Sequence, residues 1–215
     1  MKRLARWALF TLIVGGGLFA VAGTWRDPWL WAYVGVASGV TLYAMLSIPE
    51  DLARERFTPP SPGADARPLR IIRIVSLAHL IGGALDVRFG WTSMPAWLHV
   101  AGLSGFTLSF GLMVHAMRAN RFFSAVVRVQ EERGHHVVDQ GPYAVVRHPG
   151  YAAMIAAVPF SGLALGSWIA FAIALVYSWL IVRRVLFEDR FLHENLPGYP
   201  AYARRVRSRL VPGLW

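Results

Sequence analysis

The sequence has no cysteine among its 215 residues, and only 16% of its residues are charged. The absence of cysteine excludes disulfide bonds, metal sites with thiolate ligands and cysteine nucleophiles. The low charge argues against an ordinary soluble domain, in which about 25% of residues are charged. The sequence also lacks the internal repeats that many transporters have. Together, these absences favour a membrane protein that is not built from repeats.

Long apolar runs are what the sequence has instead. Hydrophobic residues make up 55% of the chain, and a bilayer core about 30 Å thick is crossed by about 20 helical residues. The apolar runs predict membrane helices at residues 7–24, 29–48, 70–89, 95–117, 151–165 and 167–187. We therefore expect an all-α fold, a polytopic membrane helix bundle with five to six transmembrane helices that ends in a C-terminal helical hairpin.

The formal net charge of +10 is unevenly distributed along the chain. If the N-terminus is cytoplasmic, the predicted helices leave only Arg26 and Arg88, of 22 Lys and Arg residues, on the outer side. The positive-inside rule predicts this asymmetry. The basic charge thus indicates topology and contact with anionic membrane lipids, not nucleic acid. We expect an integral protein of the bacterial inner membrane with both termini in the cytoplasm.

Two polar residues fall inside the third predicted helix. His79 and Asp86 are seven residues apart and share a helix face. For such intramembrane groups, a functional polar lining and a structural hydrogen bond between helices are both open. A small transporter or assembly factor without enzymatic activity would use the pair as a relay.

The most informative polar cluster is the sequence GPYAVVRHPGY, at residues 141–151. Pro149 is suited to the first turn of a helix, where unpaired backbone N–H groups attract anions. Arg147 and His148 add donors there, and Tyr151 follows His148 by three residues, so the two can face the same side. Tyr143 supplies an aromatic face and a hydroxyl. A simple belt of interfacial anchors is the alternative for this cluster alone.

A second polar cluster, RRVLFEDRFL at residues 183–192, follows the intervening apolar run. Arg184 and Glu188 are four residues apart and lie on one helix face, whereas Asp189 and Arg190 are expected to point elsewhere. A hairpin turn near residues 165–168 would return this helix end to the membrane face of His148. The pairing of the clusters predicts a cofactor pocket at the cytoplasmic boundary of the membrane.

The chain is expected to divide into two parts of one integrated domain. Residues 1–117 hold the N-terminal transmembrane helices. Residues 118–215 hold a cofactor-binding connector (residues 118–147), the helical hairpin and a C-terminal cytoplasmic segment. Within the connector we expect a short helix at residues 122–131 and an extended stretch at residues 135–138.

Together with EDRFL and the terminal GYPAYARRVRSRLVPG, the first polar cluster resembles motifs of the isoprenylcysteine carboxyl methyltransferase and phospholipid methyltransferase group. The resemblance covers roughly residues 120–213. It implies an integral membrane enzyme that transfers a methyl group from S-adenosylmethionine to a lipophilic small molecule or lipid, at a carboxylate. Methyl transfer from a sulfonium is an in-line displacement that needs no metal.

The resemblance also implies roles for individual residues. Cofactor contacts are expected from Gln130, His135, His136, Val137, Val138, Tyr143, His148, Pro149, Gly150, Tyr151 and Glu188, to which the helix-start argument above adds Arg147. Arg184 matches the position that holds the substrate carboxylate. Asp189 stands where the group usually has a second Glu, and Ala153 stands where a Gly is common.

We expect Glu188 and His148 to act in catalysis, and the resemblance implies that Arg184 positions the substrate. Glu188 would hold ribose hydroxyls or the cofactor amine. A carboxylate acceptor is already ionised at neutral pH, whereas an amine or thiol acceptor would make His148 or His136 the candidate base. A membrane NADPH-dependent reductase of the sterol-reductase type remains an alternative, although no extra basic cluster is clearly devoted to a 2′-phosphate.

Overall fold

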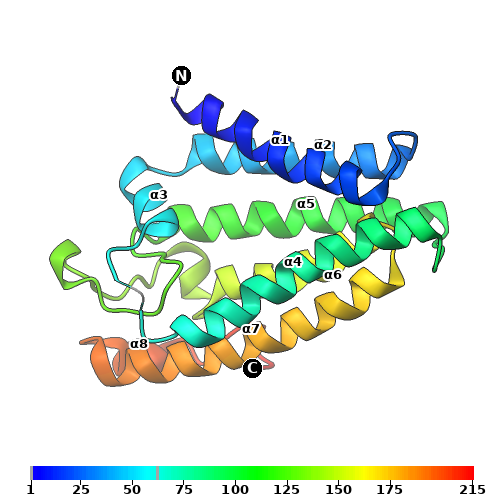
Figure 1. Cartoon of the computed structure of the whole chain (residues 1–215). Coiled ribbons are helices and arrows are strands. Elements are labelled where there is room, and N and C mark those ends of the chain that lie inside the picture. Colours follow the sequence, from blue (N-terminus) through cyan, green and yellow to red (C-terminus); the bar gives the residue numbers. More distant parts are fainter. Residues whose placement is uncertain (1, 62) are drawn as a thin grey trace.

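The computed structural model describes residues 2–61 and 63–215. Within these residues the chain is all-helical, as predicted, with eight α-helices and two short 3-10 helices. The elements are α1 (Lys2–Ala22), α2 (Pro28–Ser47), α3 (Glu50–Phe57), α4 (Ala66–Phe89), α5 (Ala96–Ala119), η1 (Glu131–Arg133), η2 (Gly141–Ala144), α6 (Pro149–Ala164), α7 (Trp168–Asn195) and α8 (Tyr199–Arg205). The long helices lie side by side in a bundle (Figure 1).

Five of the described helices, α1, α2, α4, α5 and α7, are long and apolar enough to cross a membrane. The protein is an integral membrane protein with a bundle of five such helices. The fifth predicted membrane helix corresponds to α6, which has 16 residues and is about 24 Å long, less than the bilayer core. The sixth corresponds to α7, which has 28 residues and continues eight residues past its predicted end at residue 187.

Close helix packing holds α6 within the bundle. Gly102 of α5 faces the backbone of α6, and a Cβ atom at this position would lie only 2.3 Å from the backbone nitrogen of Ala164. After the end of α6, the chain turns at Gly166, and the Ser167 side chain accepts a hydrogen bond from the Ala170 N–H to cap α7. This tight turn returns α7 along α6, as the predicted hairpin requires.

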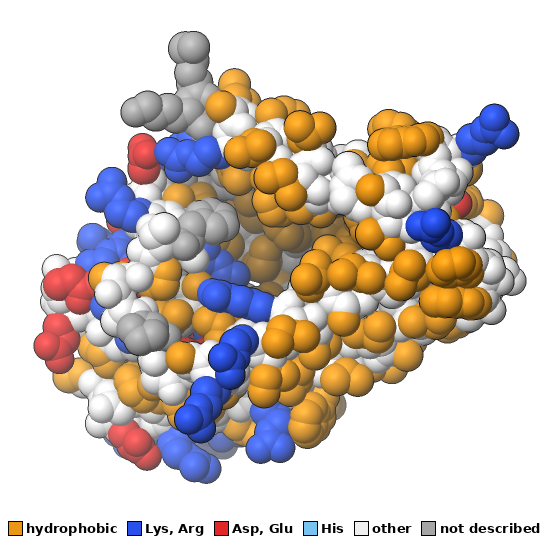
Figure 2. Space-filling model, in the orientation of Figure 1, with side chains coloured by type: hydrophobic (Ala, Val, Ile, Leu, Met, Phe, Trp, Pro, Cys, Tyr) orange, Lys and Arg blue, Asp and Glu red, His pale blue; other side chains and the backbone are white. Residues whose placement is uncertain are grey.

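The two ends of the bundle differ in what they carry. Helices α3 and α8 and the segment between α5 and α6 lie at one end, whereas the turns after α1, α4 and α6 lie at the other (Figure 1). Hydrophobic side chains cover much of the helices' visible face, and most visible Lys and Arg side chains lie toward the α3 and α8 end (Figure 2). The same view shows a hollow between α1 and α4.

The prediction of a helix at residues 122–131 is wrong. The described structure there consists of turns and irregular backbone, followed by η1. The cause is a set of partners outside the segment, because the Val127 N–H donates to Asp65 and the Val127 carbonyl accepts from the Ala64 N–H. The backbone of the connector is therefore paired with the start of α4 and not with itself. Residues 135–138 are non-helical, as predicted.

His79 and Asp86 are both buried between helices. The two ring nitrogens of His79 lie 2.9 Å from the Ala170 carbonyl and 2.9 Å from the Ser161 hydroxyl. The Asp86 carboxylate accepts hydrogen bonds from the Thr92 N–H and from the Ser167 hydroxyl. These contacts favour the structural interpretation of the pair, in which each polar side chain joins α4 to a neighbouring segment.

Candidate active site

The two polar clusters meet at the α3 and α8 end of the bundle. Arg147 donates two hydrogen bonds to Asp189, with Nε–Oδ1 and Nη2–Oδ2 distances of 2.8 and 3.0 Å. Tyr151, in the first turn of α6, donates to the Glu188 carboxylate on α7. Residues 141–151 and the end of α7 therefore form one site, as their spacing in the sequence predicted.

Asp189 is the centre of this arrangement. It points away from the face of Glu188, as predicted, but its contacts with the first polar cluster were not predicted. Its buried carboxylate also accepts from the Tyr199 hydroxyl at 2.9 Å and from Arg209 Nε at 2.9 Å, and His148 Nε2 lies 3.2 Å away. Because α7 stays helical to Asn195, residue 189 is rotated by about 100° from residue 188 and faces α8. Two arginines compensate the buried charge, as such a charge requires.

The same carboxylate fixes the charge of Arg147. Burial lowers the pKa of this arginine, but the Asp189 carboxylate outweighs burial and raises it above its ordinary value. Arg147 also donates to the carbonyls of Val206 and Arg207. The loop before α6 is thus tied both to α7 and to the segment after α8.

A cavity with about 650 Å³ of empty space, counting the part open to solvent, lies beside this network. This volume is in the range of about 300–1,000 Å³ that is typical of small-molecule sites. Ten of the predicted cofactor residues line it: His135, His136, Val137, Val138, Tyr143, Arg147, His148, Gly150, Tyr151 and Glu188. The structure brings these residues together from the connector, η2, α6 and α7.

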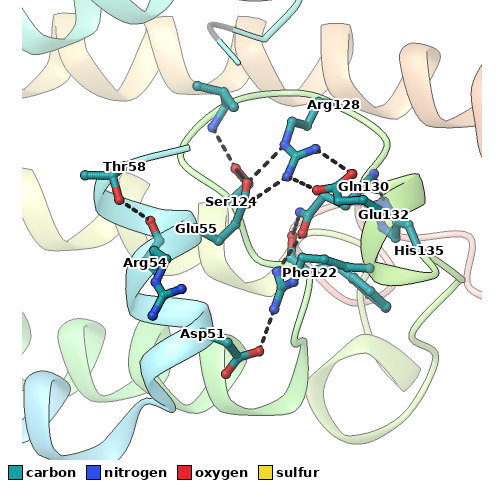
Figure 3. Close-up of polar contacts among 12 residues, drawn as sticks. Asp51, Arg54, Glu55, Thr58, Phe122, Ser124, Arg128, Gln130, Glu132 and His135 are labelled. Carbon is teal, nitrogen blue, oxygen red and sulfur yellow. Dashed lines mark hydrogen bonds and ion pairs between the residues drawn. The ribbon is translucent and has the colours of Figure 1, made fainter. Parts of the chain in front are cut away.

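The other three predicted site residues lie outside this cavity's lining. Gln130 is fully buried, where its Nε2 donates to the Phe122 carbonyl and its Oε1 accepts from Arg133 (Figure 3). Pro149 is buried at the start of α6. Arg184 lines a neighbouring cavity. Gln130 therefore shapes the connector, and Arg184 faces a different space.

Several lining residues were missed by the sequence analysis. They are Arg56, Asn120, Phe123, Ser124, Met154, Leu192, Leu196, Tyr199 and Tyr202. The two tyrosines belong to the terminal motif GYPAYARR, so the resemblance contained a signal for them. Arg56 lies on α3, in a charged stretch that has no motif, and only the folded chain brings it to the cavity.

The rim of the cavity carries uncharged polar groups. His135 Nδ1 accepts a hydrogen bond from the Gln130 N–H at 3.2 Å, and the imidazole ring packs against Phe122 with a centroid distance of 4.5 Å. Burial, followed by the charges of His136 and Arg128, lowers the pKa of His135 to about 4. Burial raises the pKa of Tyr143 above its ordinary value. Both side chains are thus neutral at pH 7.

Gly150 allows a close contact at the N-terminus of α6. A Cβ atom here would lie 2.4 Å from Cε2 of the Phe123 ring. The ring therefore occupies the space that any larger residue would fill. This contact places the connector directly against the first turn of α6.

The sequence of this region has counterparts among known proteins. The isoprenylcysteine carboxyl methyltransferase (ICMT) family matches residues 103–194. We call this matched stretch the ICMT segment. The ICMT segment runs from the middle of α5 to the end of α7, so it contains both polar clusters and ten of the predicted cavity residues.

Two plant proteins are similar over the same part of the chain. A probable protein-S-isoprenylcysteine O-methyltransferase of Oryza sativa subsp. indica is 32% identical over 94 residues, which is 43% of this chain and 49% of the rice protein. Protein-S-isoprenylcysteine O-methyltransferase B of Arabidopsis thaliana is 29% identical over 92 residues, 42% of this chain and 47% of that protein. The chain spans about half the length of the curated relatives it matches.

Proposed function

We propose that this protein is an S-adenosylmethionine-dependent methyltransferase that acts on a lipophilic acceptor at a carboxylate. The observation that carries the proposal is the cavity of the ICMT segment, where Glu188 and Tyr151 meet the neutral rim around His135. The names of the relatives support an isoprenylcysteine-like acid as the acceptor. Basic side chains at a membrane boundary suit a methyl acceptor that carries a carboxylate.

The side chains present fit the proposed cofactor. S-adenosylmethionine supplies a methyl group on a positively charged sulfur. The Glu188 carboxylate is suited to hold ribose hydroxyls or the amine, and the ring of Tyr143 or Tyr151 would favour the sulfonium by about 0.5–2 kcal/mol through cation–π attraction. The neutral His135 and the apolar Val137 and Val138 suit an uncharged ring system.

The protein's own contribution is then alignment and exclusion of water. An acceptor carboxylate is ionised at neutral pH and needs no general base. Arg147, His148 and Asp189 form a buried network that fixes the wall of the cavity, and Tyr151 orients Glu188. Alignment of two bound reactants can lower the activation barrier by up to about 7–11 kcal/mol.

The expected topology agrees with this assignment. Arg26 and Arg88 lie on the turn after α1 and at the end of α4, away from the cavity, whereas the other basic residues concentrate at its end. By the positive-inside rule, the cavity would open to the cytoplasm, with both termini on that side of the bacterial inner membrane. The acceptor would reach the site laterally from the bilayer.

Calorimetry with S-adenosylhomocysteine on the purified protein tests the proposal. We expect binding by the wild type and at least tenfold weaker binding by Glu188→Ala and by His148→Ala. Glu194→Ala removes an exposed carboxylate from the same helix and is the matched control, with unchanged affinity. Unchanged binding in both site variants would reject the site assignment. Thermal protection by NADPH in place of S-adenosylhomocysteine would favour the reductase alternative.

A further inference from the structure

A second cavity adjoins the candidate cofactor cavity. It has about 650 Å³ of empty space, again counting the part open to solvent, and is lined by Arg56, Leu69, Ile72, Arg73, Ser76, Ala125, Met154, Tyr177 and Arg184. Arg56 and Met154 line both cavities, so these two side chains stand at the boundary between them. The lining combines cationic groups with an apolar wall, which suits a lipophilic anion.

Arg184 is already compensated within this second cavity. Its Nη2 lies 2.7 Å from Oδ2 of the fully buried Asp65 and donates to the Ala125 carbonyl at 2.6 Å. Its Nε has no hydrogen-bond partner among the described residues. Arg184 can therefore offer one further donor, but its charge is matched by a carboxylate of the protein.

Arg56 has a different environment. Its Nη1 donates to the Ser124 carbonyl at 3.2 Å, and its guanidinium carbon lies 5.2 Å from the centroid of the Phe123 ring. No ion pair with Arg56 is formed within the described part of the chain. Burial, with a contribution from the neighbouring Arg184, lowers the pKa of Arg56. A half-buried cation without a carboxylate partner is suited to bind an anionic ligand through charge-assisted hydrogen bonds.

Helix α3 holds Arg56 in this place. On the same helix, Glu55 accepts hydrogen bonds from Arg128 and from the Ser124 hydroxyl, and Asp51 pairs with Arg133 at 2.7 Å (Figure 3). The Glu55 side chain is buried, and its pKa is lowered because the bonds from Arg128 and Ser124 outweigh the effect of burial. These contacts fix α3 against the connector at the residue next to Arg56 and one turn before it.

We propose that Arg56 binds the anionic group of the methyl acceptor at the boundary between the two cavities. The anion would then lie beside the cofactor cavity, with the apolar wall of the second cavity around Ile72 and Met154 taking the adjoining lipophilic part. This inference rests on the proposed function. It also assigns part of acceptor recognition to a residue outside the ICMT segment, which begins at residue 103.

The test compares an acid with its neutral analogue. The affinities of S-farnesylcysteine with a free carboxylate and of its carboxamide are measured by calorimetry in detergent, with S-adenosylhomocysteine present. The wild type should prefer the acid, and Arg56→Gln should weaken acid binding by about 10- to 100-fold, the loss expected for a charge-assisted hydrogen bond, while the amide is bound as before. Arg56→Lys should restore part of the preference. Arg54→Gln, which removes an exposed arginine from the same helix, should keep the full preference.

The outcomes separate the two proposals. Intact S-adenosylhomocysteine binding together with an unchanged acid preference in Arg56→Gln would overturn the role of Arg56 alone, as would a wild type that binds acid and amide equally. Absence of S-adenosylhomocysteine binding in the wild type would overturn the proposed function and this inference with it. A melting temperature of Arg56→Gln in detergent equal to that of the wild type shows that this variant is folded.

Discussion

Polar side chains are buried at both ends of the bundle, but they are arranged differently. Around Asp86, both carboxylate oxygens accept hydrogen bonds, one from Thr92 and the other from Ser167. None of these three residues lines a described cavity. Around Asp189, an equally buried network lies against a cavity that Arg147, His148 and Glu188 line. Burial of a polar group in a membrane protein therefore does not by itself mark a functional site. A functional site is marked by polar groups that hold one another in place by hydrogen bonds and also line a cavity.

The largest expected effect is at Asp189. Asp189→Ala leaves Arg147 buried without its carboxylate, and breaking a buried ion pair in this way costs about 3–5 kcal/mol of unfolding free energy. We expect a strongly lowered melting temperature in detergent and no measurable S-adenosylhomocysteine binding. Asp139→Ala breaks the exposed pair with Arg205 and should cost no more than about 1 kcal/mol. Equal melting temperatures for the two variants would contradict the central role given to Asp189.

Asp86→Ala tests the other end of the bundle. It leaves the buried Ser167 hydroxyl and the Thr92 N–H without their acceptor, which we expect to cost about 2–3 kcal/mol of stability. Because no part of this cluster lines the cavity, the folded variant should bind S-adenosylhomocysteine with the affinity of the wild type. A tenfold change in that affinity, measured by calorimetry below the melting temperature, would show that the two ends are coupled and would break the comparison.

Much of the fold and of the candidate site could be predicted from the sequence, because helix period and chain turns are local properties. The apolar runs identified the membrane helices, and Pro149 identified the start of α6. The spacing of the two polar clusters identified the face where they meet. His79 and Asp86 remained open between two interpretations, since the partners that decide the matter, Ser161 and Ser167, come from a different part of the chain.

The errors have physical causes of the same kind. The central role of Asp189 was missed because only its own helix was considered, whereas Tyr199 and Arg209 approach it from the segment after α7. The helix predicted at residues 122–131 is replaced by pairing with Asp65. Arg56 reaches the site through tertiary contacts of α3. In each case a partner distant in sequence overrides a local preference, and no local pattern reveals that partner.

Gly150 offers a smaller test on the cavity side. Gly150→Ala places a methyl group against the Phe123 ring, and overpacking of this kind costs about 1–3 kcal/mol. Since Phe123 lines the cavity, we expect both a lower melting temperature and weaker S-adenosylhomocysteine binding. Gly111→Ala is the matched control, because a Cβ atom there meets nothing within 4 Å. A stability and an affinity as little affected as in Gly111→Ala would mean that the connector does not pack on α6 as described.

The smallest expected effect is a pH dependence that belongs to the cavity rim. His135 titrates near pH 4 in the folded protein and near 6.5 in the unfolded chain. Between these values the unfolded chain binds a proton that the folded protein does not. The contribution of His135 to stability is therefore complete above about pH 6.5 and is lost as the pH falls toward 4. For a partly exposed ring we expect about 1 kcal/mol. His135→Gln should flatten the fall in melting temperature across this window, whereas His115→Gln, at an exposed position of α5, should retain it. If both variants lose stability with pH as the wild type does, protonation of His135 does not contribute to that loss.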